Sequence, residues 1–573
     1  MTGRAPILGR RRFVQAAACV VPFASVQTAG HASVLRGPTV ALEIAAVSIV
    51  VAGRTKTAIG INGMSPAPTL HWREGDTVTI AVTNRLAEPT SLHWHGLRVE
   101  AAMDGVPGFG FRAIAPGETF VYRLTLRQAG TYWYHSHSGF QEQAGLYGAI
   151  VIDPRDGYAE PFDRDYVVLL SGWSDTRAET MIGNLKAQSD YYNAGRRTVG
   201  TFLRDLGETG LAATLADRRA WGEMRMTPTD ILDAGGSAFT YTINGHSADA
   251  GWTALYRSGE RVRLRFINAS SMTLFDVRVP GLPMLVVQAD GNDVEPVEVD
   301  ECRLGVGETY DAIVRPDGDR AFAVFAQAMD RGGFALGTLA PRQGMIASAP
   351  PMDRPPLRSM ADMGMNHSMP EGGAPMEHGG AHATSTPNMH DGHGSAAPSP
   401  MASQSAAGAI GVSVDNVVAN PIDRLGEPGT GLENNGRRVL TYAQLRATRA
   451  GDDPRPPSRD IQLRLTGNMA RFIWGFDGKT HAEAEPIPLR LGERVRFVLI
   501  NDTMMEHPIH LHGFWSELEN GQGAYQPYKH TILVKPAERL SFLVTADEPG
   551  RWAFHCHMLF HMETGMFREV RVS

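Results

Sequence analysis

The chain has 573 residues, and its 54 Lys and Arg against 61 Asp and Glu give a formal net charge of −7. Its 43% hydrophobic and 20% charged residues are typical of a globular protein, and this length predicts roughly three or four domains. No basic run indicates a nucleic-acid partner, and after the N-terminal segment no stretch approaches the ~20 apolar residues of a membrane span. We therefore expect neither nucleic-acid binding nor stable membrane insertion.

The N-terminal segment has the features of an export signal. Three arginines, residues 10–12, precede Phe13, and an apolar run from Ala16 to Val26 is followed by small residues suitable for cleavage. A basic N-terminal region, a short apolar region and a cleavage site with small residues define a signal peptide. Paired arginines before Phe resemble a twin-arginine signal, so we predict that residues 1–32 direct export to the periplasm. An ordinary secretory signal is the alternative.

Short strand patterns recur three times along the chain. Segments 75–79, 259–263 and 492–496 each open an alternating run that ends at an Asn, namely Asn84, Asn268 and Asn501. Nine residues after each Asn stand His93, Val277 and His510. Alternating β-branched and aromatic residues between Gly, Pro, Asn and Asp turns predict β-sandwiches, and the repeat predicts three homologous ones.

The segments between these runs differ in composition. We predict an all-β protein with Greek-key β-sandwich domains at residues 33–160, 161–345 and 411–573. Residues 176–222 form a polar, partly helical insertion. Residues 346–410 are rich in Met, His, Gly, Pro and Ser. Because that composition buries too little apolar surface to offset ordering, we predict a flexible linker there.

Of the three predicted sandwiches, the two outer ones carry clusters of histidines. The clusters are His93-Trp94-His95-Gly96, His135-Ser136-His137, residues 507–513 with His507, His510 and His512, and His555-Cys556-His557 followed by His561 and Met566. On a strand, residues i and i+2 point to the same face, so each His-x-His pair directs two imidazoles to one side. Four such pairs can converge where two sandwiches meet. Imidazole and thiolate are ligands that suit copper.

These four clusters resemble the copper-ligand motifs of the multicopper oxidases, the family of laccases, ascorbate oxidase and cuprous oxidases, in family order. The resemblance implies cupredoxin-like domains and four copper ions, in domain 3 and at the interface of domains 1 and 3. It implies a type 1 copper bound by His507, Cys556 and His561, with Met566 as the weak axial ligand. It implies a type 2 copper at His93 and His510. The type 3 pair would be bound by His95, His135, His137, His512, His555 and His557.

The resemblance also points to residues that handle protons. Asp104 stands where the family places an acidic residue near the type 2 copper, and we expect it to relay protons and orient ligands. Several bacterial relatives have a Glu directly after the last histidine ligand, where this chain has Met562 and then Glu563. Because neighbouring residues on a strand face opposite sides, we expect that Glu563 does not simply replace that Glu. Glu563 is therefore a second catalytic candidate, with a plain solvated carboxylate as the alternative.

The predicted linker carries thioethers and imidazoles, and thioethers favour Cu(I). We predict accessory binding of labile copper there, with a low-complexity spacer as the alternative. The candidate ligands are Met360, Met363, Met365, His367, Met369, Met376, His378, His382, Met389, His390 and His393. The isolated His71, His246, His481 and His530 are expected not to bind metal, and Cys302 is expected to be a small core residue.

The signal, the Met/His-rich segment and the ending 561–569 resemble the CopA-type copper-resistance oxidases of the bacterial periplasm. That resemblance implies oxidation of Cu(I) to Cu(II) coupled to reduction of dioxygen to water. One alternative is a laccase-like oxidase whose donor is a small phenol or aromatic amine. Another is a periplasmic copper-sequestering protein. We expect a monomer, because domains 1 and 3 can complete the cluster within one chain.

Overall fold

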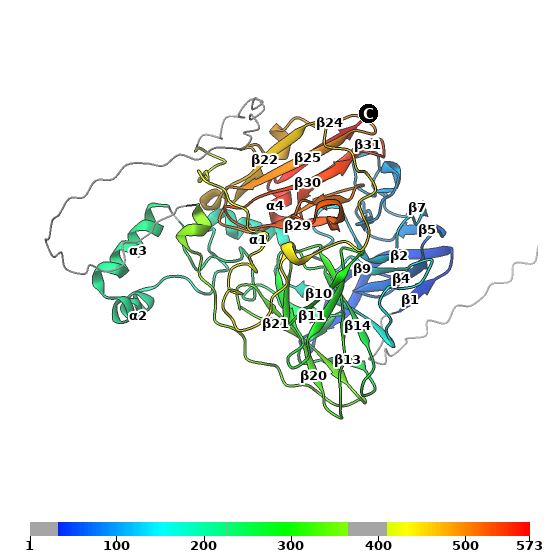
Figure 1. The fold of residues 1–573 in the computed structure, drawn as a ribbon, viewed down its shortest axis with the longest axis horizontal. Helices are drawn as coiled ribbons and strands as arrows, with labels where there is room; N and C mark the ends of the chain where they lie inside the picture. Colours follow the sequence, from blue (N-terminus) through cyan, green and yellow to red (C-terminus); the bar gives the residue numbers. More distant parts are fainter. Residues whose placement is uncertain (1–32, 225, 365–409) are drawn as a thin grey trace, which may run out of the picture. The chain divides into compact units, whose positions relative to one another are not determined.

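The computed structural model describes residues 33–224, 226–364 and 410–573 (Figure 1). The predicted signal peptide, residues 1–32, lies outside the described residues. The strands form six sheets, which confirms the predicted all-β class. Among the described residues, no helix combines the length and apolar composition needed to cross a membrane.

The first sandwich consists of the sheets β1-β4-β9-β8-β6 and β3-β2-β5-β7. Leu42, Leu70, Ile80 and Ile150, which come from both sheets, are buried in one apolar core. Along β5 every second residue is buried, as the alternating sequence predicts. The strands are β1 (Val34–Arg36), β2 (Thr39–Val51), β3 (Arg54–Ile61), β4 (Ala67–Arg73), β5 (Thr77–Asn84), β6 (His93–His95), β7 (Thr119–Thr125), β8 (Gly130–His135) and β9 (Tyr147–Asp153).

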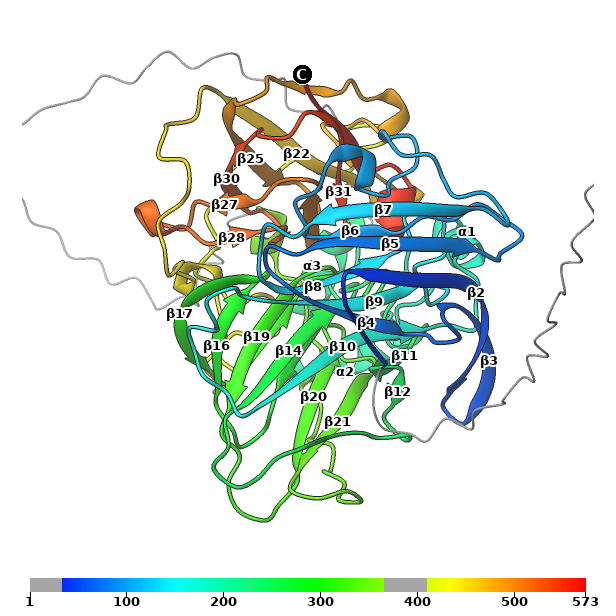
Figure 2. The same ribbon diagram turned by 90° about the vertical axis from the view of Figure 1, so that its right-hand side faces the viewer.

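The second sandwich, drawn in green in Figure 2, consists of the sheets β12-β11-β10-β14-β19-β16-β17 and β13-β21-β20-β15-β18. Its strands are β10 (Arg164–Trp173), β11 (Thr240–Ile243), β12 (His246–Ser247), β13 (Trp252–Leu255), β14 (Val262–Asn268), β15 (Phe275–Arg278), β16 (Met284–Ala289), β17 (Asn292–Val299), β18 (Glu301–Leu304), β19 (Thr309–Val314), β20 (Phe322–Ala328) and β21 (Phe334–Ala340).

The third sandwich consists of the sheets β23-β22-β25-β30-β27-β28 and β24-β32-β31-β26-β29. A short helix, α4 (Leu559–Glu563), follows β31. The strands are β22 (Asp460–Asn468), β23 (Ile473–Phe476), β24 (Ile487–Leu489), β25 (Arg494–Asn501), β26 (His507–Leu511), β27 (Ser516–Leu518), β28 (Tyr528–Lys529), β29 (Thr531–Val534), β30 (Arg539–Thr545), β31 (Gly550–Cys556) and β32 (Phe567–Val572).

The predicted repeat has a structural counterpart at the end of β5, β14 and β25. Each strand ends at its Asn, and the backbone N–H of that Asn donates to the carbonyl of a glutamate: Asn84 to Glu118, Asn268 to Glu308 and Asn501 to Glu538. Each Asn side chain also donates from Nδ2 to two carbonyls, one in the following loop (Glu88, Thr273 or Met505) and one in a more distant segment (Ile114, Leu304 or Val534). The same polar residue therefore fixes the same loop in all three sandwiches.

The insertion is helical, as the sequence indicated. It contains α1 (Ala178–Ala187), α2 (Val199–Thr209) and α3 (Leu211–Glu223). Met181 and Leu185 of α1 are fully buried in the core shared with the second and third sandwiches, whereas α2 has no buried residue. Short 3-10 turns lie at Ala101–Met103, Met360–Met363, Tyr442–Gln444, Met469–Arg471, His481–Glu483 and Gly523–Tyr525.

The segment expected to be a flexible linker is described only at its two ends, residues 346–364 and residue 410. Arg358 is buried and ion-paired with Glu506 of the third sandwich. Ser359 begins a 3-10 turn in which its hydroxyl accepts from the N–H of Asp362. The start of this segment is therefore held against the protein. Residues 365–409, with most of the candidate Met and His ligands, lie outside the described residues.

Residues 410–459 contain no named strand and run along the second sandwich. Leu440 donates its N–H to the carbonyl of Glu301, and Arg437 pairs with the Glu301 side chain. Val294 and Ala447 form an isolated β-bridge. The structural start of the third sandwich is therefore β22 at Asp460, and the preceding segment ties that sandwich to the second one.

Candidate metal centres

Most of the predicted ligand histidines lie on β6, β8, β26 and β31 or within two residues of the end of one of these strands, and His561 lies in α4. β6 pairs with β8 so that His93 lies opposite His135, and β26 pairs with β31 so that His510 lies opposite His555. Cross-strand neighbours on one face of a sheet have their Cβ atoms about 5 Å apart, so each pairing gathers imidazoles at one place. The His-x-His spacing then adds the next residue on the same face.

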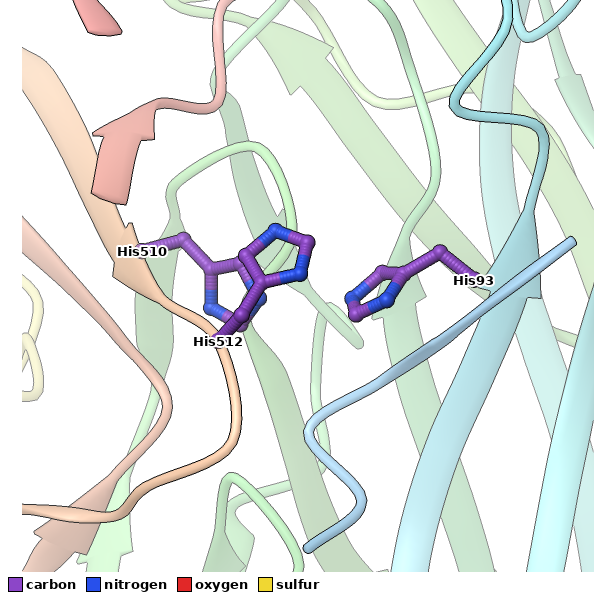
Figure 3. Close-up of side chains that lie close together, drawn as sticks. All are labelled: His93, His510 and His512. Carbon is purple, nitrogen blue, oxygen red and sulfur yellow. The ribbon is translucent and has the colours of Figure 1, made fainter. Parts of the chain in front are cut away.

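Eight histidines of the first and third sandwiches come together: His93, His95, His135, His137, His510, His512, His555 and His557. His95 Nδ1 lies 3.2 Å from His557 Nε2, and the rings of His93 and His512 are 3.9 Å apart between centroids. Figure 3 shows His93 facing His510 and His512 from the opposite sandwich. The cluster is therefore formed by two domains, as the sequence predicted from its motifs.

Several triplets in this cluster have the spacing of a metal site. The ligand atoms of His93, His510 and His512 lie within 4.8 Å of one another, and so do those of His137, His512 and His555. His512 Nε2 is 3.0 Å from His555 Nε2. Three imidazole nitrogens at such distances can bind one ion between them.

A second cluster lies within the third sandwich. His507 Nδ1 and His561 Nδ1 are 3.1 Å apart, and Cys556 Sγ lies 3.6 Å from the first and 3.7 Å from the second. All three side chains are fully buried. Met566 is buried too, and its carbonyl accepts from the N–H of Cys556 at 3.1 Å. Two imidazoles, one thiol and a nearby methionine make up the donor set of a blue copper site.

The pKa values of the clustered groups favour metal binding. Burial lowers the pKa of His95, His510, His512 and other members of the cluster well below their usual value, and the neighbouring imidazoles lower it further. Burial also lowers the pKa of His555 to about 3. These imidazoles are therefore neutral near pH 7, the form that binds a metal. Burial raises the pKa of Cys556, so its thiolate needs a positive partner.

Asp104 joins the two domains at the larger cluster. Its Oδ2 lies 2.9 Å from His512 Nδ1, and its backbone carbonyl lies 2.9 Å from His93 Nδ1. The Asp104 side chain is buried, with its Oδ1 at 3.3 Å from the same His93 nitrogen. One residue thus contacts the outer nitrogens of two predicted ligands, the arrangement expected of a group that orients them.

Three further polar side chains contact ligand histidines, and the sequence motifs did not indicate them. Glu142 Oε2 lies 2.7 Å from His135 Nδ1, Thr503 Oγ1 lies 2.7 Å from His507 Nε2, and Asp233 Oδ2 lies 2.6 Å from His561 Nε2. Asp233 belongs to the second sandwich region, far from the motifs. Such contacts fix the ring orientation and leave the opposite nitrogen free for a metal.

His530, one of the isolated histidines expected not to bind metal, borders the larger cluster. Its Nδ1 lies 3.2 Å from His95 Nε2, and its carbonyl oxygen lies 2.6 Å from His510 Nδ1. Burial lowers its pKa to about 4. His530 stands alone in the sequence because its contacts come from the fold and not from a His-x-His spacing. The other three isolated histidines, at 71, 246 and 481, are partly exposed.

Glu563 was expected on a strand, and that expectation is wrong. The chain leaves β31 after Cys556, and Glu563 is the last residue of α4, where the N–H of Met562 donates to the carbonyl of Met558. Glu563 lines a cavity of about 510 Å³ together with His137 and Phe567. Burial raises its pKa, and the charge of Glu142 raises it further. The strand argument against Glu563 therefore does not apply.

Among the candidate accessory copper ligands, the described residues include Met360 and Met363. Met360 is partly buried against the apolar core, and Met363 belongs to the same 3-10 turn. Met365, His367, Met369, Met376, His378, His382, Met389, His390 and His393 lie outside the described residues. Cys302 is buried and free, as expected, and Cys556 is also free in the part of the chain that the structure describes.

Comparison with known proteins gives a consistent result. Three family models described as "Multicopper oxidase" match residues 43–157, 205–342 and 454–573. The "Copper resistance protein A homolog" of Pseudomonas syringae pv. tomato is 50% identical over 562 residues, covering 95% of this chain and 94% of that protein. "Copper resistance protein A" of Escherichia coli is 49% identical over 571 residues, with coverages of 95% and 94%. The crystal structure of a multi-copper oxidase from Pseudomonas thermotolerans, 21% identical, has a similar fold with a TM-score of 0.58 over 95% of this chain and 100% of that one.

Proposed function

The chain belongs to the multicopper oxidase family, and on that basis we propose that it oxidises Cu(I) to Cu(II) and passes the electrons to dioxygen, which is reduced to water. Family membership implies a copper-dependent oxidoreductase. Two relatives that share about half of their residues with this chain are named copper resistance proteins. That likeness supports a role in copper resistance, and the N-terminal signal pattern supports export to the periplasm by the twin-arginine route.

The buried ligand atoms fit copper. His93 Nε2, His135 Nε2 and His510 Nε2 are buried without a hydrogen-bond partner among the described residues, although their other ring nitrogens are all hydrogen-bonded. Leaving a buried polar atom unpaired costs about 1–3 kcal/mol, so three in one place point to a missing partner. Neutral imidazoles and a thiolate are the donors that bind copper well.

The ligand assignment of the family fits this geometry. We assign His507, Cys556, His561 and Met566 to a type 1 copper, and His93 and His510 to a type 2 copper. A type 3 pair would be bound by His95, His135, His137, His512, His555 and His557. The whole set comes from one chain, which supports a monomer.

Copper bound at these positions would supply one-electron redox chemistry at the mononuclear site and four-electron reduction of dioxygen at the cluster. Cys556 ends β31 and lies between His555 and His557 in the sequence, so its backbone would give a short covalent route from the mononuclear copper to the cluster. Asp104 holds His93 and His512 in place and is our first candidate for moving protons. Glu563, in the cavity beside His137, is the second.

The contact between Asp233 and His561 is the observation that favours Cu(I) over a phenol as the electron donor. A copper ion held by His507, Cys556 and His561 would accept the electrons of the donor. The outer nitrogen of His561 is hydrogen-bonded to the Asp233 carboxylate at 2.6 Å, and both side chains are fully buried. Burial and the charge of Asp233 raise the pKa of the neighbouring Asp230 well above its usual value. Asp230 is therefore held in its neutral form, and the Asp233 carboxylate attracts a cationic donor such as Cu(I) more strongly than it attracts a neutral phenol.

Steady-state dioxygen uptake by the copper-loaded protein tests this function. With Cu(I) and a simple phenol as competing donors, we expect kcat/KM to favour Cu(I). A blue protein that prefers the phenol would make it a laccase-like enzyme. A protein that binds copper without consuming dioxygen would leave sequestration as its role.

A further inference from the structure

The second sandwich contributes no predicted ligand, yet the tip of its β16–β17 hairpin lies beside the histidine cluster. The hairpin turns through Asp290 and Gly291, whose φ angles are 47° and 75°. Two central residues with positive φ are typical of a type I′ turn. A Cβ on Gly291 would lie 2.3 Å from the ring of Tyr132 in the first sandwich. Any side chain at position 291 would therefore clash with Tyr132, and only a tight turn with glycine there lets the hairpin tip lie against the first sandwich.

The Asp290 carboxylate holds one segment of the third sandwich, residues 529–531. Its Oδ2 accepts from the backbone N–H of His530 at 3.0 Å and of Thr531 at 3.1 Å, and it lies 3.1 Å from Lys529 Nζ. Its Oδ1 accepts from the N–H of Thr309 at 3.0 Å. Asp290, Lys529 and His530 are fully buried. Asp290 Oδ2 thus holds both backbone N–H groups of this segment and faces its lysine.

The topology explains why this segment needs an external acceptor. Lys529 ends β28 in one sheet, Thr531 begins β29 in the other, and His530 lies between them where the chain changes sheets. At such a crossing the backbone N–H groups leave one ladder before they join the next. A buried N–H without a partner is costly, and Asp290 removes that cost.

Segment 529–531 in turn holds two predicted ligands by different nitrogens. The carbonyl oxygen of His530 lies 2.6 Å from His510 Nδ1, so the other ring nitrogen of His510, Nε2, faces the cluster. The Thr531 hydroxyl and His530 Nδ1 lie 3.1 Å and 3.2 Å from Nε2 of His95, which leaves Nδ1 facing the cluster. The segment thus selects which nitrogen of each imidazole is free for a metal.

We propose that Asp290 is a positioning residue for the dioxygen-reducing cluster, acting through segment 529–531 on His95 and His510. The inference rests on the proposed function, because it assumes copper at these histidines. In this proposal the second sandwich, which holds no predicted ligand, helps to orient the ligands of the cluster through Asp290. Among the described residues, the Asp290 carboxylate makes no hydrogen bond to a predicted ligand nitrogen. It contacts segment 529–531, and that segment contacts the ligands.

A purely structural role for Asp290, as the counter-ion of buried Lys529, is the rival explanation. Asp311 is a matched control for that role. It is equally buried in the same sandwich and paired with Arg263 and Arg265, but it has no contact with segment 529–531. Asp311→Asn therefore reproduces the loss of a buried carboxylate charge without the loss of an acceptor at the cluster.

The test compares wild type, Asp290→Asn, Asp311→Asn and Thr531→Val after copper loading. An amide accepts on only one of its two atoms, so Asp290→Asn cannot accept from segment 529–531 and from the N–H of Thr309 at the same time, and it removes the charge that faces Lys529. Thr531→Val keeps the shape and removes only the hydroxyl that faces His95. The readouts are copper per chain, the share of that copper visible by electron paramagnetic resonance, and the rate of copper loss to a chelator. The thiolate-to-copper absorption reports the mononuclear site separately.

We expect Asp290→Asn and Thr531→Val to lose cluster copper about 10- to 100-fold faster than wild type while the thiolate-to-copper absorption stays unchanged. Asp311→Asn should lose it at the wild-type rate. Equal rates for Asp290→Asn and Asp311→Asn would overturn the proposal. If Asp290→Asn does not fold, an unchanged rate in Thr531→Val would overturn it instead. A wild type that binds no copper outside the mononuclear site would overturn the proposed function and this inference together.

Discussion

Arg358 and Glu506 form a two-point ion pair in the interior of the protein. Arg358 Nη1 donates to Glu506 Oε1 at 3.0 Å, and Nη2 donates to Oε2. Both side chains are buried, and Glu506 directly precedes His507. Arg358 comes from the segment whose composition indicated a flexible linker. The pair therefore anchors the start of the Met/His-rich segment next to the strand that carries a predicted copper ligand.

Arg358→Leu should lower the free energy of unfolding by about 3 kcal/mol, because it leaves the Glu506 carboxylate buried without its partner. Arg303, at 3.9 Å from Glu506, keeps the loss from being larger. Urea unfolding followed by tryptophan fluorescence measures it. Arg342→Leu, which breaks the exposed pair with Asp319, is the control and should not shift the midpoint measurably. Equal midpoints for the two variants would contradict the anchoring role.

Asp104→Asn should slow reoxidation of the enzyme by dioxygen about 10- to 100-fold, because the carboxylate that orients His512 becomes an amide. Reduction of the mononuclear site by the donor should keep its rate, since Asp104 does not contact that site. Single-turnover absorption measures the two steps separately in the same sample. A variant that slows both steps equally would show that Asp104 acts on the whole fold.

Asp233→Asn should lower kcat/KM for Cu(I) about tenfold, because it removes the negative charge at the outer nitrogen of His561. The kcat/KM for an uncharged phenol should change much less. Competing dioxygen-uptake assays with the two donors measure the ratio. Asp317→Asn, at an exposed carboxylate of the second sandwich, is the control. If both donors lose the same factor, the carboxylate does not select a cationic donor.

Deletion of residues 365–393 should reduce Cu(I) oxidation at low Cu(I) concentration while phenol oxidation is kept or increased. The deletion starts after the 3-10 turn at Met360–Met363, so the ion pair between Asp362 and Arg424 stays in place. Thioethers and imidazoles of this segment are the proposed collectors of Cu(I). The visible absorption of the loaded protein checks that the mononuclear site is intact. Unchanged Cu(I) oxidation would rule out this role for the segment.

Asp415 should make stability fall as pH rises from about 4 to 6. Burial raises its pKa to about 6 although its Oδ2 accepts from the N–H of Met469. The folded state therefore binds more protons than the unfolded state in this window, and the carboxylate destabilises the fold once it is charged. Asp415→Asn should be about 2 kcal/mol more stable than wild type at pH 7 and equal to it at pH 4, measured by urea unfolding.

The opposite sign is expected at Asp453. Hydrogen bonds from Arg455 and Thr545 lower the pKa of this carboxyl. Its charge therefore adds stability above the unfolded pKa, and Asp453→Asn should lose stability at pH 7. If both Asn variants shift stability in the same direction at pH 7, the assigned causes of these pKa shifts are wrong.

The sequence alone determined the fold class, the threefold repeat and the residue types of the site. Strand alternation depends only on neighbouring residues, so the runs ending at Asn84, Asn268 and Asn501 could be found without a structure. The His-x-His pairs are local in the same way, because a strand directs residues i and i+2 to one face. Family resemblance then supplied the grouping of those pairs into copper sites.

The tertiary structure alone decided which groups surround the ligands. Asp233 reaches His561 across 328 positions, and His530 reaches His95 across 435. Such contacts depend on how separate sheets pack, and packing leaves no periodic pattern in the sequence. Glu563 was misplaced for a related reason: the chain turns into α4 directly after Cys556, and no local signal marked where the strand ends. The ligands are thus set by local geometry, and their orientation is set by distant backbone and carboxylates that only the folded chain brings together.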